Sequence, residues 1–266
     1  MKVFKIFVFA SALCTMSLFV SCELLDEAVA PGLTEGEVIE GLKEALGVGL
    51  DNSVLSASSV DGYLKNEVIR ILLPEEVVEL QNKIQTETVA GIPLQTLYTA
   101  YIAVENDGND LFEDLAMAMN RGAERAADKA VPIFGSAITN MSISDGFDIL
   151  NGNETAATSF FYESTNQALF EAFNPDVKSA LDATGANQLF TKTAEFLNYD
   201  YNVLIGTISP SDVLEINLPN SIDEYATGKA IDGLFHLVGE EEKKIRDNPF
   251  AWGSAIIEKV FGSVLN

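Results

Sequence analysis

The sequence predicts an all-α fold, a single multi-helix globular domain with one short extended segment near residues 63–73. Apolar residues recur at helical spacing along most of the chain, and capping residues, glycines and prolines bracket these stretches. One stretch, "YLKNEVIRILLP", is short, rich in Val, Ile and Leu, and closed by Pro74, which favours extended chain lying on the core. No fixed-period repeat or low-complexity block divides the chain, so we expect one domain.

The first helix is predicted to begin at Thr34, with Glu37 completing a capping box three residues later. Apolar residues then recur at every fourth position from Val38 to Leu50, which marks one buried face. The turn-forming stretch "DNSVLSASSVDG" predicts that this helix ends near Leu50. After the extended segment, Pro74 suits the first turn of a second helix.

The middle of the chain reads as helices separated by short breaks. Gly91 and Pro93 interrupt two helices, and "ENDGND" is a loop. A long helical stretch from Asp110 is predicted to bend or break at Pro132. "SISDGFDIL" predicts a short capped helix, "ETAATSFFYESTNQALFEAF" a helix with an aromatic stripe, and Pro175 the start of another.

The C-terminal part is predicted to hold three more helices. "NQLFTKTAEFLNY" is the first, and the irregular stretch "NVLIGTISPSDVLEINLPN" follows it. Ser221 and Glu224 predict a capping box that opens a long helix, which Asn248 and Pro249 end. "FAWGSAIIEKVFGSVLN" is the last predicted helix.

The N-terminus has the pattern of a bacterial export signal. Two lysines precede an uncharged apolar run over residues 6–20, and "FVSC" resembles the lipobox of bacterial lipoproteins. The resemblance implies that Cys22 carries the lipid, that residues 1–21 are removed as a signal peptide, that residues 22–33 form an acidic tether, and that residues 34–266 form the helical domain. The alternative is an ordinary secretory signal cut after Ala30. It would place Pro31 directly after the cut, and acidic residues before it.

The charge of the chain argues against a nucleic-acid partner. The whole sequence has 16 basic and 40 acidic residues, and the predicted signal peptide removes two basic ones, which leaves a net charge of −26. Phosphate backbones and anionic lipid headgroups would repel such a surface. No second apolar run is long enough to span a bilayer, so we expect membrane attachment through the acyl anchor alone.

Two predicted helices supply a candidate polar network, formed by Asn120, Arg121, Glu124, Glu241 and Arg246. An Arg121–Glu241 ion pair across the two helices is the most specific expectation, and its role would be structural. The stretch "EEEKKIRD" also offers acid–base pairs at i, i+4, among them Glu242–Arg246, which are typical of an exposed helix end.

The sequence predicts no catalytic residue, no metal site and no cofactor. His236 is the only histidine, and Asp232 and Glu240 flank it at i−4 and i+4, so a general base is an alternative to a solvated polar residue. A lone histidine cannot build a typical zinc site. An EF-hand register on the "ENDGND" loop fails, because Ala103 and Asp114 stand at the first and twelfth ligand positions.

Phenylalanines at helical spacing are expected to form the core, although they would also suit a cavity for an acyl chain. These residues are Phe160, Phe161, Phe170, Phe173, Phe190 and Phe196.

Four ordered stretches, "DGYLKN…IRILLP", "MNRGAE…PIF", "AATSFFYEST" and "KAIDGLFHLVGEEEKKIRDNP…VFG", resemble the bacterial exported family catalogued as domain of unknown function 4197. The resemblance covers about residues 34–262. It implies an exported all-helical protein, and it supplies neither an activity nor catalytic residues.

Together these patterns predict a lipid-anchored protein of the cell envelope with a non-catalytic binding or structural role. Its partner would be an envelope protein or an apolar small molecule. Glu23, and not aspartate, follows the lipidated cysteine, which favours the outer membrane and a periplasmic orientation. Two alternatives stay open: a periplasmic carrier of a lipid or other apolar ligand, and a hydrolase that uses carboxylates with His236.

Overall fold

The computed structural model describes residues 33–204 and 206–265. The predicted signal peptide, Cys22 and all of the tether except Leu33 lie outside the described residues. Within them, the α-helices are α1 (Glu35–Ser58), α2 (Glu75–Thr86), α3 (Leu94–Glu105), α4 (Leu111–Ala126), α5 (Val131–Asn140), α6 (Ile143–Leu150), α7 (Ala156–Thr184), α8 (Ala186–Leu197), α9 (Asp223–Asp247) and α10 (Ala255–Gly262).

Short elements fill the connections. Two antiparallel hairpins pair β1 (Thr88–Val89) with β2 (Ile92–Pro93) and β3 (Tyr201–Val203) with β4 (Gly206–Ile208). The 3-10 helices are η1 (Ala127–Ala130), η2 (Pro210–Asp212) and η3 (Pro249–Trp252). The all-α prediction is therefore confirmed, and the strands are hairpins in positions where loops were expected.

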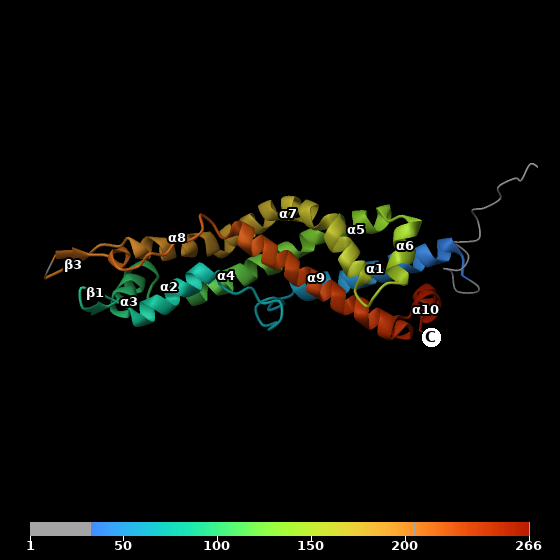
Figure 1. The fold of residues 1–266 in the computed structure, drawn as a ribbon, viewed down its shortest axis with the longest axis horizontal. Coiled ribbons are helices and arrows are strands. Elements are labelled where there is room, and N and C mark those ends of the chain that lie inside the picture. The colour runs from blue at the N-terminus through green and yellow to red at the C-terminus, as the bar shows by residue number, and fades with distance from the viewer. Residues whose placement is uncertain (1–32, 205, 266) are drawn as a thin grey trace, which may run out of the picture.

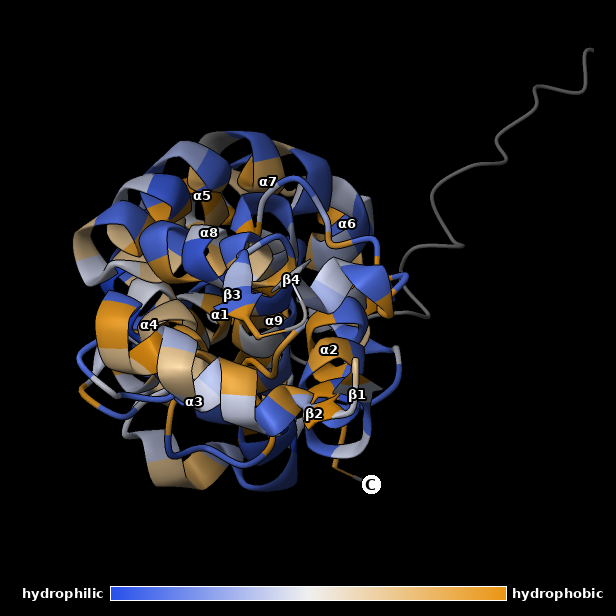
Figure 2. Cartoon of the chain, turned by 90° about the vertical axis from the view of Figure 1, so that its left-hand side faces the viewer, coloured by the Kyte–Doolittle hydropathy of each residue, from blue (hydrophilic) through white to orange (hydrophobic). Residues whose placement is uncertain are grey.

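The molecule is elongated (Figure 1). α4, α7 and α9 pack against one another along its middle, and α1 lies beside α9. Both hairpins lie at one end with α2, α3 and α8, while the start of α1, α6 and α10 lie at the other. Seen end-on, the helices surround a shared interior (Figure 2). No helix in the described residues is both long enough and apolar enough to span a membrane.

The capping predictions are confirmed for two helices and wrong for a third. Thr34 and Glu37 form a complete capping box at the start of α1, and Ser142 does the same for α6. The predicted Ser221–Glu224 box does not form, because α9 begins one residue later, with Ile222 at the N-cap position and no side-chain cap.

Two predicted helix ends are wrong. α1 continues to Ser58, because Ser53 and Val54 turn inward onto the core, where the Ser53 hydroxyl donates to the Gly49 carbonyl at 2.6 Å. α7 continues through Pro175. This proline is exposed, on a side of the helix where water can satisfy the carbonyl that loses its hydrogen bond.

The predicted extended segment is shorter than expected. Residues 59–69 form bends and turns apart from Asn66, and residues 70–74 are the one continuous run of this segment that is free of turn or helix. Tyr63, Ile69 and Ile71 are buried, so the segment does lie on the core as predicted. Four of the six phenylalanines named from the sequence are buried, and Phe160 and Phe170 pack against the core from its edge.

Candidate functional site

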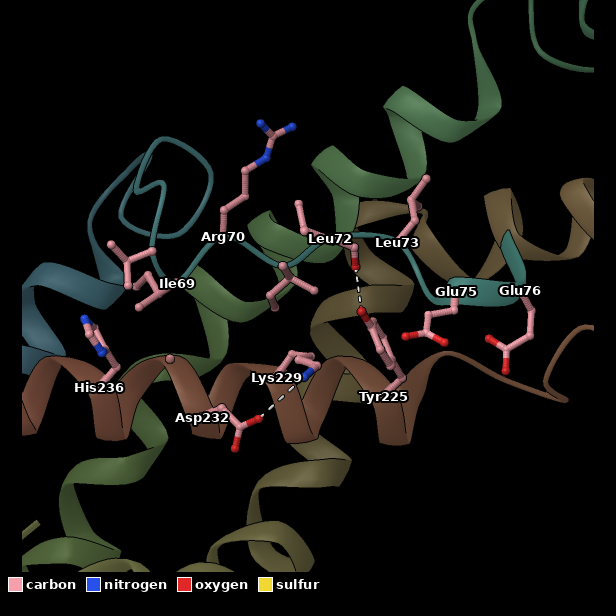
Figure 3. A pocket seen from close by; sticks show the side chains of 13 residues that line it. Ile69, Arg70, Leu72, Leu73, Glu75, Glu76, Tyr225, Lys229, Asp232 and His236 are labelled. Atoms are coloured by element: carbon pink, nitrogen blue, oxygen red, sulfur yellow. Dashed lines mark hydrogen bonds and ion pairs between the residues drawn. The ribbon is translucent and has the colours of Figure 1, made fainter. Parts of the chain in front are cut away.

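A hollow of about 680 Å³ lies between residues 68–76 and α9. We name it the α9 groove. Val68, Arg70 and Leu72 contribute to one wall, and Tyr225, Lys229 and His236 line the other. His236 lies at one end of the groove and Glu75 and Glu76 lie at the other (Figure 3).

An asparagine side chain holds the first wall against α4. The backbone N–H of Ile71 donates to Asn120 Oδ1 at 2.8 Å, and Asn120 Nδ2 donates to the Ile71 carbonyl at 2.8 Å. Asn120 is completely buried, and its Nδ2 also donates to the Ala116 carbonyl within α4. All polar atoms of this buried amide therefore have partners, and the position of residue 71 is fixed.

A buried carboxylate holds the turn that precedes the wall. Glu124 Oε1 accepts the backbone N–H groups of Tyr63 and Leu64, both at 3.2 Å, and Glu124 Oε2 accepts Arg121 Nη1 at 2.7 Å. Arg121 Nη2 lies 2.7 Å from Asp61. Hydrogen bonds from Lys65 and Arg121 lower the pKa of Asp61, so this carboxylate stays charged near neutral pH.

Two tyrosines tie the same segment to α9. The buried Tyr63 hydroxyl donates to the Ala230 carbonyl at 2.7 Å, and the Tyr225 hydroxyl donates to the Leu72 carbonyl at 3.0 Å. Burial raises the pKa of both hydroxyls, so they remain donors. Gly233 lets the segment approach α9, because a Cβ there would lie 2.8 Å from Tyr63 Cε1.

The groove combines exposed apolar groups with charges of both signs. Val68 and Leu72 are 68% and 65% exposed. Lys229 lies 3.8 Å from Asp232, a long ion pair on the opposite wall. Arg70 forms no ion pair with any residue of the described segments, although carboxylates greatly outnumber cations in this chain. The wall of the groove therefore carries exposed apolar groups beside an arginine whose side chain is directed away from α9 (Figure 3), where a carboxylate of a partner could reach it.

His236 also lines a second hollow of about 370 Å³ between α7 and α9, beside Ser159 and Tyr162 of α7. It is exposed, and within residues 33–204 and 206–265 it has no hydrogen bond or ion pair. Both flanking carboxylates pair with lysines, Asp232 with Lys229 and Glu240 with Lys243. The geometry does not activate this histidine as a general base.

The predicted Arg121–Glu241 pair is wrong. Arg121 binds Asp61 and Glu124, whereas Glu241 accepts Asn52 Nδ2 at 3.1 Å and Lys244 Nζ at 2.6 Å. The reason is the orientation of α9 at this point, where Glu241 faces Gly49 of α1 and not α4. Asn120, Arg121 and Glu124 do come together at the groove wall, and Arg246 belongs to a separate cluster.

That second cluster joins the ends of α6 and α7. Glu242 accepts the backbone N–H of Ala157 at 2.9 Å and of Thr158 at 2.8 Å, while Arg246 donates to the carbonyls of Ile149 and Leu150. Glu242 and Arg246 also pair at 2.9 Å. Each charge lies at the helix end whose dipole it complements.

The i, i+4 pairing of Glu242 with Arg246 was thus predicted correctly. The exposed setting was wrong, because the ends of α6 and α7 cover both side chains.

The "ENDGND" loop, whose sequence fails the EF-hand register, uses its polar groups for helix capping. Asp110 Oδ1 accepts the backbone N–H groups of Phe112 and Glu113 in the first turn of α4, and Asn106 Nδ2 donates to Asp114 at 3.0 Å. Among the residues that the structure describes, no group of three or more His, Cys, Asp or Glu side chains is arranged to hold a metal ion.

The chain was compared with protein families, curated proteins and solved structures. The family model described as "Protein of unknown function (DUF4197)" matches residues 32–262. No curated protein and no solved structure matches the chain.

Proposed function

The chain belongs to the DUF4197 family, and from this premise we propose that it is a lipid-anchored protein of the bacterial cell envelope that binds a partner through the α9 groove, without catalysis. Its place would be the outer membrane, facing the periplasm. The "FVSC" pattern supports the proposed anchor, and so does the net charge, because an acidic surface favours attachment through acyl chains over binding to anionic headgroups.

The observation that carries the binding role is the way the groove wall is held. Residues 61–72 have no regular secondary structure, yet Asn120, Glu124 and two tyrosines fix them to α4 and α9. A wall fixed in advance loses little conformational entropy when a partner binds, so weak contacts suffice for useful affinity. The buried polar groups at the wall thus preorganise a surface.

The chemistry of the groove favours a protein partner. We propose a segment of another envelope protein that packs an apolar side chain against Leu72 and brings a carboxylate to Arg70. A charge-assisted hydrogen bond to that arginine would add specificity, and the apolar contact would add most of the affinity.

The alternatives have less support. A carrier needs an enclosed apolar space, but the apolar cavity between α1 and α9, lined by residues such as Leu46 and Val238, has a volume of about 10 Å³. That is near the lower limit for one water molecule. A hydrolase that uses His236 needs a partner to orient the imidazole, and both neighbouring carboxylates bind lysines instead.

Cell fractionation of the Cys22→Ser variant tests the anchor. We expect the wild-type protein to sediment with outer membranes and the variant to appear in the soluble periplasmic fraction. If the variant still sediments with membranes in the same proportion, the lipid anchor is wrong.

Photocrosslinking in intact cells tests the groove. A photoreactive amino acid at position 72 should give one discrete adduct, while the same group at Val104, an exposed residue of α3, should not. Arg70→Glu should weaken the adduct at position 72. Equal adducts at both positions, or no effect of Arg70→Glu, would contradict partner binding in the groove.

A further inference from the structure

Three exposed apolar side chains gather near α10. Phe250, in η3, is 62% exposed, and Val264 and Leu265 follow α10 and are also exposed. Phe250 packs over Gly262, where an added Cβ would lie 3.3 Å from the phenylalanine ring. η3 and the residues after α10 are thus adjacent. We name Phe250, Val264 and Leu265 the end patch.

The end patch lies at the end of the molecule where the described chain begins. α10 packs across the first turns of α1, with Lys259 Nζ 2.6 Å from Glu37 and Val260 directly over Gly41. Figure 1 shows α10 and the start of α1 together at one end of the elongated body, opposite the hairpins.

Chain length limits how far this end can lie from the proposed anchor. Leu33 is eleven residues after Cys22. Eleven residues span at most about 40 Å when fully extended, and a flexible chain of that length has a root-mean-square extension of about 18 Å. The start of α1, and α10 beside it, would therefore stay close to the bilayer.

We propose that the end patch contacts the lipid bilayer, so that the molecule stands on this end. The inference rests on the proposed lipid anchor. Three apolar side chains alone bind a membrane weakly, but a short tether turns that encounter into an intramolecular one with a high effective concentration. The acidic surface elsewhere opposes wider contact with anionic headgroups, so the contact is confined to the patch.

The single tryptophan reports on this contact. Trp252 lies in η3 with Phe250, and it is the only tryptophan in the sequence. The full-length lipidated protein would be reconstituted into phosphatidylcholine vesicles with or without brominated acyl chains, which quench tryptophan at close range. We expect Trp252 fluorescence to fall by at least one third in the brominated vesicles. Unquenched Trp252 in protein that floats with the vesicles would overturn the proposal.

Variants separate the patch from the anchor. Phe250→Ser/Val264→Ser/Leu265→Ser should still float with the vesicles, but with at least half of the quenching lost. Leu204→Ser, at the fully exposed tip of the opposite hairpin, should be quenched like the wild type. If the triple variant is quenched as strongly as the wild type, the end patch is not the contact.

Loss of flotation in the wild type would instead mean that the anchor itself is wrong. A second reporter covers the case in which the triple variant fails to fold. In Trp252→Phe/Leu204→Trp, the tryptophan sits at the far hairpin, and we expect no quenching there. Strong quenching at position 204 would show that the molecule lies flat, against the proposal.

Discussion

The side-chain amide of Asn120 and the backbone of Ile71 exchange two hydrogen bonds, each 2.8 Å long, at a position closed to solvent. Two residues facing each other in an antiparallel sheet make the same exchange through their backbones. Asn120 therefore makes the two hydrogen bonds that a neighbouring strand would make. A side chain of α4 thus satisfies the backbone polar groups of Ile71 in the irregular wall of the α9 groove. The consequence is that the shape of the groove depends on one side chain of α4.

Replacing Asn120 with leucine should destabilise the protein by about 2–4 kcal/mol. The Ile71 N–H and carbonyl would remain buried without partners, and each such group costs roughly 1–3 kcal/mol. Urea unfolding followed by circular dichroism measures the loss. The matched control is Asn82→Ala in α2, where the exposed side chain makes no hydrogen bond within the described residues. Equal stability of the two variants would contradict the assigned role.

Glu242→Gln should destabilise the protein by about 3 kcal/mol, because it leaves Arg246 buried without a counter-charge. The double variant Glu242→Gln/Arg246→Met should recover part of this loss, since the unpaired charge is gone as well. Glu240→Gln removes the more exposed pair with Lys243 and should cost less than about 1 kcal/mol. If the double variant is no more stable than Glu242→Gln alone, the proposed coupling between the two side chains is wrong.

Local features of the fold were open to prediction from the sequence. The capping boxes of α1 and α6, the helix break near Pro132 and the Glu242–Arg246 pair all depend on residues within four positions of each other. The end of α1 could not be predicted from the sequence. Ser53 and Val54 stay helical because their tertiary packing outweighs the turn-forming composition of this stretch.

The candidate site depends on contacts between distant parts of the chain. Asp61, the partner of Arg121, is 60 residues away in sequence, and Ala157, which binds Glu242, is 85 residues away. No periodicity encodes such pairs. The sequence indicates the groove wall only weakly. The one sign is an alternation in which Arg70 and Leu72 are exposed while Ile69 and Ile71 are buried.

Gly233→Ala should destabilise the protein and widen the α9 groove. The new methyl group would meet Tyr63 Cε1 at 2.8 Å and Ile69 Cβ at 3.1 Å, so the segment must move away from α9. Gly228→Ala, in the same helix with open space around it, should instead stabilise by about 0.5–1 kcal/mol. Thermal unfolding of each variant measures its change in stability relative to the wild type. If both alanines stabilise the protein, the close approach at Gly233 does not constrain the wall.

Glu37 should make folding stability depend on pH in the acid range. The hydrogen bond from Lys259, followed by those from the Thr34 backbone and hydroxyl, lowers the pKa of Glu37 from 4.5 to about 2. A carboxyl whose pKa is lower in the folded state stabilises the protein above its unfolded pKa. That contribution should be lost as the pH falls from about 4.5 to about 2.

The measurement is the urea midpoint between about pH 5 and about pH 2. The midpoint of Glu37→Gln should fall less steeply than that of the wild type, although Asp61 and Asp145, whose pKa values are also lowered, contribute to the decline in both. Lys259→Met removes the largest cause of the shift and should raise the pKa of Glu37, as seen by NMR of its carboxyl carbon. A Glu37 carboxyl that titrates alike with and without Lys259 would show that this ion pair, which fastens α10 to the start of α1, does not form in solution.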